Sequence, residues 1–175
     1  MRAYKVGDVF SARPFKGKPV AGVLDAEGLD DAAMQAIARW TNLSETTFVL
    51  PATQAGADYR LRIFTPKREL PFAGHPTLGS AHAVLEAGRY SPQKGVLVQE
   101  CQQGLVRIVV EGEGENRHLV FDLPEAAVTP LAPADIEELE AIVGLAVRRD
   151  VAPAVIDVGA VWVVAQVATA KALLG

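Results

Sequence analysis

One apolar helix constrains the fold of this chain more than any other feature. The segment GHPTLGSAHAVLEAG, residues 74–88, has Pro76 where proline suits the first turn of a helix and Gly88 where glycine suits its end. Between them the residues are small or apolar on almost every side. A helix that is apolar all round must be buried all round. We therefore predict a sheet or barrel of strands wrapped around one central helix near residues 76–87, and we expect His82 on this helix to be a buried, satisfied histidine.

Segments on both sides of this helix have the composition of β-strands. Residues 44–51 are β-branched and aromatic and end at a proline. Residues 57–66 alternate cleanly, so that Tyr59, Leu61 and Ile63 face one side of a sheet. Further strands are predicted at residues 4–10, 20–25 and 117–124, with a pair in 95–112; a helix is predicted at 29–43, with Asp30 or Asp31 as its N-cap. The fold class predicted from this order is α+β.

The character of the sequence changes near residues 123–133, LPEAAVTPLAP, which we interpret as a domain boundary. The predicted domains are 1–125 and 126–175. The second contains a helix in APADIEELEAIVGL with Asp135 as its cap, a strand pair or one bent strand in AVIDVGAVWVVAQVA, and the start of a helix in TAKALLG. Trp162 is expected in the core, and Trp40, at the end of the first helix, in the core or an interface.

Bulk properties exclude several classes of partner. The net charge of −4 offers no basic surface for nucleic acid, and no segment approaches the roughly 18 apolar residues of a membrane span. Cys101 is the sole cysteine, so no intramolecular disulfide can form, which favours a reducing, cytoplasmic location. Its neighbours include no cation that would activate the thiol, so a structural role is expected. No histidine pair has the spacing of a metal site, and no metal is predicted.

Two elements of the sequence suggest chemistry. Glu45 stands where the strand at 44–51 begins, a place where a carboxylate can be both held and reached. Gly74, His75, Pro76 and Thr77 open the apolar helix, where unpaired amides and the positive end of the helix dipole can bind a small anion. A carboxyl group beside a bound carbon acid can move a proton. Taken alone, each element has an ordinary structural reading as a solvated residue or a helix cap.

The paired motifs NLSETTFVL and ELPFAGHPTLGSAHAVLEAG, with the opening VFSARPFKGKPVAGVLDAEGL, closely resemble the phenazine-biosynthesis isomerase family, called PhzF-like. The resemblance implies a diaminopimelate epimerase-like fold of two pseudo-symmetric halves, each a strand barrel around a central helix, with the active site between them. It implies that Glu45 is the catalytic acid/base and that Gly74 and His75, with Pro76 and Thr77 beside them, bind substrate. It implies no metal or organic cofactor and a small, anionic, cyclic or amino-acid-like substrate.

The sequence departs from the family at two places, and it differs from the related epimerases at a third. Lys18 stands in the early loop where the family usually has asparagine, and Ala73 stands where the epimerases have a cysteine, which disfavours two-cysteine racemisation. The run that opens the central helix of the family's second half is not found, so the second half is expected to be incomplete. Two functions stay open: an isomerase acting through Glu45, or a truncated, catalytically incomplete homologue that serves only in assembly or binding. In either case we expect a homodimer or a partner chain that supplies the missing half.

Overall fold

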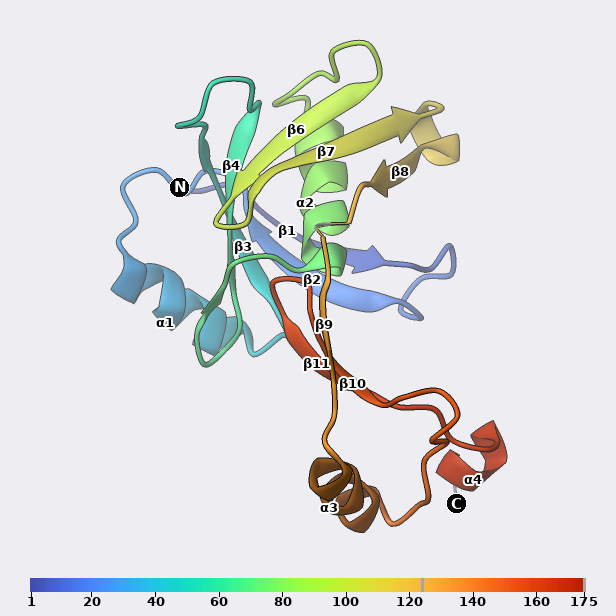
Figure 1. Cartoon of the computed structure of the whole chain (residues 1–175). Helices are drawn as coiled ribbons and strands as arrows, with labels where there is room; N and C mark the ends of the chain where they lie inside the picture. The colour runs from blue at the N-terminus through green and yellow to red at the C-terminus, as the bar shows by residue number, and fades with distance from the viewer. Residues whose placement is uncertain (124, 175) are drawn as a thin grey trace. The chain divides into compact units, whose positions relative to one another are not determined.

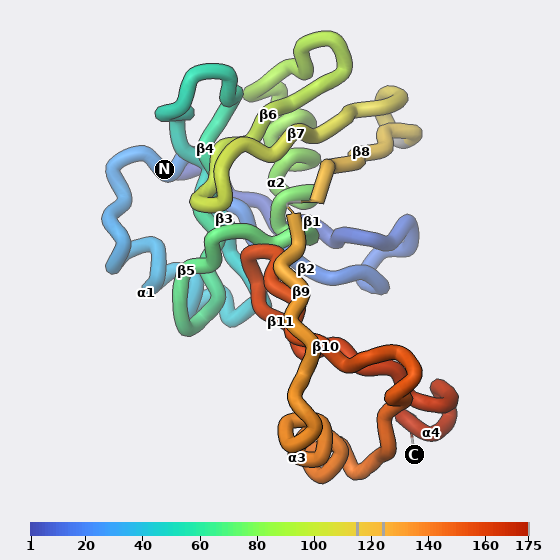
Figure 2. Tube along the Cα trace, viewed as in Figure 1, coloured from blue at the N-terminus to red at the C-terminus, as the bar shows by residue number. Residues whose placement is uncertain are grey.

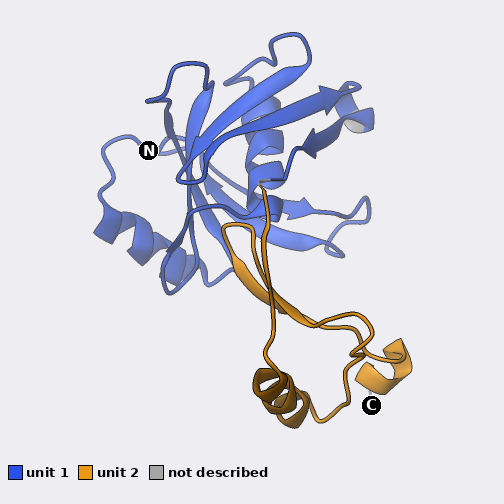
Figure 3. Ribbon diagram, viewed as in Figure 1, with its two compact units in different colours: residues 1–124 blue, residues 125–175 orange. Residues whose placement is uncertain are grey.

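The structure of this chain, a computed structural model, describes residues 1–123 and 125–174. Pro124, at the end of the predicted strand segment 117–124, and Gly175, at the end of the predicted helix in TAKALLG, lie outside the described residues. The chain divides into two compact units, residues 1–124 and 125–175 (Figure 3). Each unit has a sheet of its own.

The first unit contains one curled sheet and two α-helices (Figure 1). Its strands are β1 Tyr4–Val9, β2 Lys18–Val23, β3 Thr46–Pro51, β4 Tyr59–Phe64, β5 Glu69–Leu70, β6 Val96–Cys101, β7 Gly104–Glu111 and β8 His118–Phe121. Its helices are α1 Asp31–Thr41 and α2 Gly74–Glu86, with a 3-10 turn at Gly114–Asn116. The strands and helices predicted for this part of the chain are confirmed, and β5 is an additional short strand that pairs with β4.

The sheet follows the order β1-β2-β3-β4-β6-β7-β8 and curls around α2, as the tube in Figure 2 also shows. The pairs β2–β3 and β4–β6 are parallel, and the other neighbours are antiparallel. The parallel pairing sets Ala21 opposite Thr46, so β2 and β3 begin at the same edge of the sheet. That shared edge is where the candidate site forms.

Alternation along the strands separates two apolar clusters. Tyr59, Leu61 and Ile63 pack with α2 on the inner face of the sheet, as predicted from their spacing. Phe48 and Phe64 pack with α1 in the second cluster, and their rings meet edge to face with centroids 5.4 Å apart. The sheet is therefore covered by α2 on one face and by α1 on the other.

The ends of both helices follow from single residues. Asp30 is the N-cap of α1, because its Oδ1 accepts a hydrogen bond of 2.8 Å from the Ala33 amide. Asn42 closes α1 in the left-handed conformation, with φ of 55°. Gly88 follows α2 with φ of 64°, which glycine adopts without steric cost, and this confirms the predicted end of the helix.

The prediction that α2 is covered on every face is wrong for one face. His82 and Glu86 are exposed, and Leu78 on the same side is only partly buried. The physical reason is that β1 and β8 end the strand order and no described strand pairs with both of them. His82 is accordingly an exposed residue, and the expectation of a buried histidine there is corrected.

The second unit contains a three-stranded antiparallel sheet of order β11-β10-β9. The strands are β9 Ala127–Pro130, β10 Ala154–Asp157 and β11 Val161–Val164; the helices are α3 Pro133–Val143 and α4 Ala170–Leu174. The predicted strand pair is confirmed as β10 and β11, whereas β9 lies in the segment interpreted only as a boundary. The N-cap of α3 is Ala132 with no side-chain hydrogen bond, so the prediction that Asp135 caps this helix is wrong. Proline at the first position of α3 sets its φ instead.

Both tryptophans are on the surface of the described structure. Trp40 is 81% exposed on α1, away from the buried stripe of Met34 and Ala38. Trp162 is 58% exposed, so the prediction of a core position is wrong. Trp162 lies on β11, an edge strand on which all four residues are exposed. None of the helices in the described part of the chain is long and apolar enough to cross a membrane.

Candidate active site

Glu45 is fixed at the point where β3 begins. Thr46, the first residue of β3, shares a hydrogen bond of 2.6 Å with Thr41 at the end of α1. The Thr47 hydroxyl donates to the Ala21 carbonyl at 3.2 Å and accepts from Ser80 of α2 at 2.8 Å. These bonds join α1, β2 and α2 to the start of β3, so the backbone that carries Glu45 is held from three sides.

The Glu45 carboxylate is buried but incompletely paired. The residue is 9% exposed, and its Oε2 has no hydrogen-bond partner among the described residues. Two nitrogens lie nearby at ion-pair distances: His75 Nδ1 at 3.4 Å and Lys18 Nζ at 3.6 Å. A buried carboxylate oxygen that the fold does not satisfy carries a cost of about 1–3 kcal/mol and identifies a candidate reactive group.

His75 lies in the first turn of α2 and is almost fully buried. Its Nε2 is 3.4 Å from the Pro19 carbonyl of β2, and its ring lies 6.4 Å from that of Phe10. Burial lowers the pKa of His75 below its ordinary 6.5; the Glu45 carboxylate opposes this shift and the Lys18 ammonium adds to it. The imidazole is therefore neutral at neutral pH and can take up or release a proton beside Glu45.

The structure brings Glu45 and His75 together and leaves the other three predicted residues with structural contacts of their own. A Cβ on Gly74 would lie 3.0 Å from Phe121 Cζ of β8, so a larger residue there would require the Phe121 ring to shift. Thr77 is fully buried, and its hydroxyl accepts from Gln99 Nε2 at 3.1 Å. Pro76 is buried and supplies no amide. Among the described residues no side chain caps α2, whose N-cap is Ala73, so no described side chain satisfies the first amides of the helix.

Sequence reasoning missed two further residues of the site. Lys18 was identified only as a departure from the family's early loop, and the structure places its ammonium beside Glu45. Phe10 follows β1 with φ of 69°, an uncommon value for a non-glycine residue, and is exposed while its ring flanks His75. The pairing of the parallel strands places Lys18 here, and no local pattern reveals that pairing.

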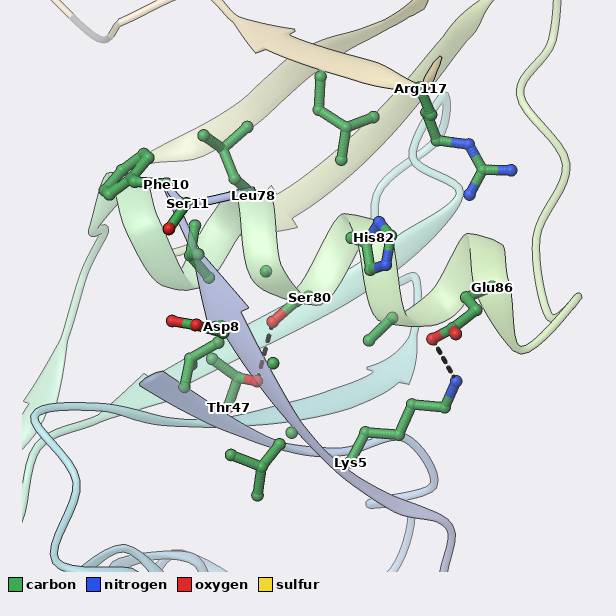
Figure 4. Close-up of a pocket in the computed structure, with 18 of the residues that line it drawn as sticks. Lys5, Asp8, Phe10, Ser11, Thr47, Leu78, Ser80, His82, Glu86 and Arg117 are labelled. Atoms are coloured by element: carbon green, nitrogen blue, oxygen red, sulfur yellow. Dashed lines mark hydrogen bonds and ion pairs between the residues drawn. The ribbon is translucent and has the colours of Figure 1, made fainter. Parts of the chain in front are cut away.

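A cavity lies beside this site rather than around it. A cavity of about 690 Å³ follows the uncovered face of α2 between β1 and β8 (Figure 4). His82, Glu86 and Arg117 stand around it, and Lys5 donates to Glu86 at 2.6 Å. Neither Glu45 nor His75 lines it. The Glu45–His75 pair, which holds the unsatisfied carboxylate oxygen, is therefore the candidate site.

Cys101 has the structural role expected from the sequence. It is buried in the inner cluster, and its Sγ lies 3.5 Å from the Gly104 carbonyl across the β6–β7 turn. Burial raises the pKa of its thiol, which makes a reactive thiolate unfavourable.

Comparison with known proteins now decides the family. The model of the phenazine biosynthesis-like protein family matches residues 7–174, which includes Glu45, His75 and the whole of both units except their outermost residues. The chain belongs to the phenazine biosynthesis-like protein family.

Several known proteins resemble this member of the phenazine biosynthesis-like family in sequence or in fold. Antisense-enhancing sequence 1 of Schizosaccharomyces pombe is 46% identical over 176 residues, covering 98% of this chain and 60% of that protein. Trans-2,3-dihydro-3-hydroxyanthranilate isomerase of Pseudomonas fluorescens is 54% identical over 145 residues, covering 81% of this chain and 49% of that protein. The solved structure of a predicted epimerase from Pseudomonas aeruginosa has a TM-score of 0.83 at 32% identity, covering 98% of this chain and 61% of that chain.

These matches confirm the α+β, epimerase-like fold predicted for this member of the phenazine biosynthesis-like family. They also establish that it is related to isomerases. The chain spans 60% and 49% of the length of the two curated relatives named above. The assignment of residues 1–125 and 126–175 to the two halves of that fold stays a prediction.

Proposed function

We propose that this chain is an isomerase in which Glu45 moves a proton between two atoms of a small, anionic, cyclic or amino-acid-like substrate. The observation that carries the proposal is the Glu45 Oε2 atom, which is buried, lacks a hydrogen-bond partner among the described residues, and lies 3.4 Å from His75 Nδ1. A carboxylate that the fold holds in place but does not satisfy is suited to accept a proton from a ligand.

The proposed reaction needs only proton transfer. The Glu45 carboxylate removes a proton from a saturated carbon, and the electron pair of the broken C–H bond enters the adjoining conjugated system. The resulting carboxylic acid returns the proton to a different carbon of that system, so atoms and electrons balance without an oxidant or reductant. His75 is placed to share the proton with Glu45, since its Nδ1 faces the carboxylate. This proton transfer needs no cofactor, as the family resemblance also implies.

The first turn of α2 is the proposed binding site for the anionic group of the substrate. The helix begins without a side-chain cap at Gly74 and His75, so its free amides and the positive end of its dipole favour a carboxylate. Lys18 adds a cation close to Glu45. Pro76 and Thr77 support this turn, Pro76 by restricting its φ and Thr77 by holding Gln99.

The proposal is tested with the compound named for the relatives. The purified 175-residue chain is incubated with trans-2,3-dihydro-3-hydroxyanthranilate, and the vinyl and ring C–H signals are followed by NMR. We expect the signals of an isomer to replace those of the substrate. Absence of conversion by the folded chain at stoichiometric concentration contradicts the proposal for this compound and favours the second function.

The second candidate function is that of an assembly or binding module. One observation favours it: Val161, Trp162, Val163 and Val164 of β11 are all exposed, which gives the second unit an apolar edge strand. A homodimer or a partner chain that covers this strand is the proposed consequence. The cytoplasmic location expected from the single cysteine stays a prediction.

A further inference from the structure

Lys18 occupies a defined place beside the candidate acid/base pair. Its Nζ lies 3.6 Å from Glu45 Oε2, an oxygen that is buried. The Lys18 side chain itself is 45% exposed, so it lies partly in solvent. The same oxygen faces His75 Nδ1 at 3.4 Å. Two nitrogens therefore compete for one carboxylate oxygen, one from a lysine ammonium and one from an imidazole.

The backbone fixes Lys18 in this position. Lys18 is the first residue of β2 and pairs with Val9 of β1. A Cβ on Gly17 would lie 2.2 Å from the Val9 carbonyl oxygen, so only glycine allows the chain to enter β2 this closely. The next residue, Pro19, presents its carbonyl to His75 Nε2 at 3.4 Å. Two consecutive residues at the start of β2 thus contact both members of the pair.

The two contacts together determine where protons can lie. A carbonyl oxygen only accepts hydrogen bonds, so His75 Nε2 must carry its hydrogen to bond with Pro19. A neutral His75 then has its lone pair on Nδ1, directed at a carboxylate oxygen 3.4 Å away. Two electron-rich atoms at this distance repel unless a cation stands beside them or a proton lies between them. Lys18 is that cation.

We propose that Lys18 is a positioning residue that serves as the counter-ion of Glu45 and so keeps His75 neutral and the carboxylate free to accept a proton from substrate. This inference rests on the proposed function of Glu45. Without Lys18, the imidazolium form of His75 would become the counter-ion of Glu45, and the pair would hold its proton before substrate arrives.

The electrostatics around His75 agree with this role. Glu45 and Lys18 are the charged groups that act on His75, from the start of β3 and the start of β2, while the ring of Phe10 flanks it without charge. Burial lowers the pKa of His75 most, Glu45 raises it, and Lys18 lowers it again. Removing the Lys18 charge therefore raises the His75 pKa, whereas a merely structural role for Lys18 would leave it where it is.

The test is an NMR titration of the imidazole C–H signals of the whole chain. The sequence has three histidines, so His82→Gln and His118→Gln assign the signals and leave that of His75. Lys18→Met removes the charge at similar length, Lys18→Arg retains it, and Lys18→Asn introduces the residue usual in the family. Lys5→Met is the matched control, because it removes an ammonium that pairs with Glu86 rather than with Glu45.

We expect the His75 midpoint to rise by about half a pH unit or more in Lys18→Met and in Lys18→Asn, and to stay near the wild-type value in Lys18→Arg and Lys5→Met. An unchanged midpoint in both neutral variants overturns the proposal, even if Glu45→Gln abolishes turnover. A raised midpoint in a chain that converts no substrate supports the Lys18 contact and counts instead against the isomerase function. The two proposals can therefore fail separately.

Discussion

Gly79 provides a test of how α2 packs against the sheet. This packing matters for the candidate site because it holds His75, on α2, beside Glu45. A Cβ on residue 79 would lie 2.5 Å from Val20 Cγ1 and 2.9 Å from Val9 Cγ2. Non-bonded carbons pack best at about 3.5–4.0 Å, so Gly79→Ala creates two overlaps of roughly 1 Å. Both valines are β-branched and lie on paired strands, which leaves them little freedom to move aside.

The expected loss of stability follows from two opposing terms. Overpacking a core costs about 1–3 kcal/mol. Alanine is better than glycine in a helix interior by about 1 kcal/mol, which offsets part of that cost. Because two rigid neighbours are overlapped at once, we expect the upper part of the range, a net decrease of about 1–2 kcal/mol in the free energy of unfolding.

Urea unfolding followed by circular dichroism measures this change, and a decrease of about 2–4 °C in melting temperature per kcal/mol accompanies it. Gly7→Ala is the matched control, because its Cβ would lie 3.9 Å from the same Val20 Cγ1, and its effect should stay within about 0.5 kcal/mol. In a double-mutant cycle, Val20→Ala should relieve part of the Gly79→Ala cost. If Gly79→Ala is as stable as wild type and shows no coupling to Val20→Ala, the packing argument is refuted.

Three further predictions concern pH, anions and association. Burial lowers the pKa of His75, so below about pH 6.5 the unfolded chain binds more protons than the folded chain. The free energy of unfolding should therefore fall as the pH decreases from that value, and it should fall less steeply in His75→Gln. Equal slopes in the two proteins would contradict the burial argument. Sulfate should shift the amide NMR signals of Gly74 and His75 more than chloride at equal ionic strength, and equal shifts would count against an anion site at the start of α2. Light scattering coupled to size exclusion should give a mass above the 18.6 kDa of one chain, with Trp162→Ser reducing it; a folded peak at 18.6 kDa for the wild type would rule out association through β11.

The elements of this fold were predictable where the signal is local. Alternation predicted β4 because one side of it, including Leu61, is buried. Small and apolar residues predicted the central position of α2, and Asp30 predicted the start of α1. The short strands β5 and β9 and the N-cap of α3 were missed, and the exposure of His82 and Trp162 was predicted wrongly. His82 is exposed because no described strand lies between β1 and β8. The sequence of a helix does not show whether a strand will cover each of its faces.

The candidate site was only half predictable, for the same reason. The family resemblance identified Glu45 and His75, and in the structure Glu45 Oε2 lies 3.4 Å from His75 Nδ1. Lys18 is 27 residues before Glu45, and the parallel pairing of β2 with β3 brings the two together. Gly74 also depends on a long-range contact, because a Cβ there would lie 3.0 Å from the ring of Phe121, 47 residues later. Contacts of this kind depend on strand order, which local pattern does not encode.

The central claim is that Glu45 carries the proton, and deuterium transfer tests it most directly. Wild type, Glu45→Gln and the control Glu86→Gln are incubated with trans-2,3-dihydro-3-hydroxyanthranilate in D₂O, and the deuterium content of each carbon is read by NMR and mass spectrometry. Glu45→Gln keeps the shape of the side chain and removes the ionisable group, so its isomerisation rate should fall by about 10²–10⁴-fold with the fold retained. Glu86→Gln removes an exposed carboxylate that pairs with Lys5 and should isomerise at the wild-type rate. Isomerisation and label transfer by folded Glu45→Gln at the wild-type rate would contradict the account.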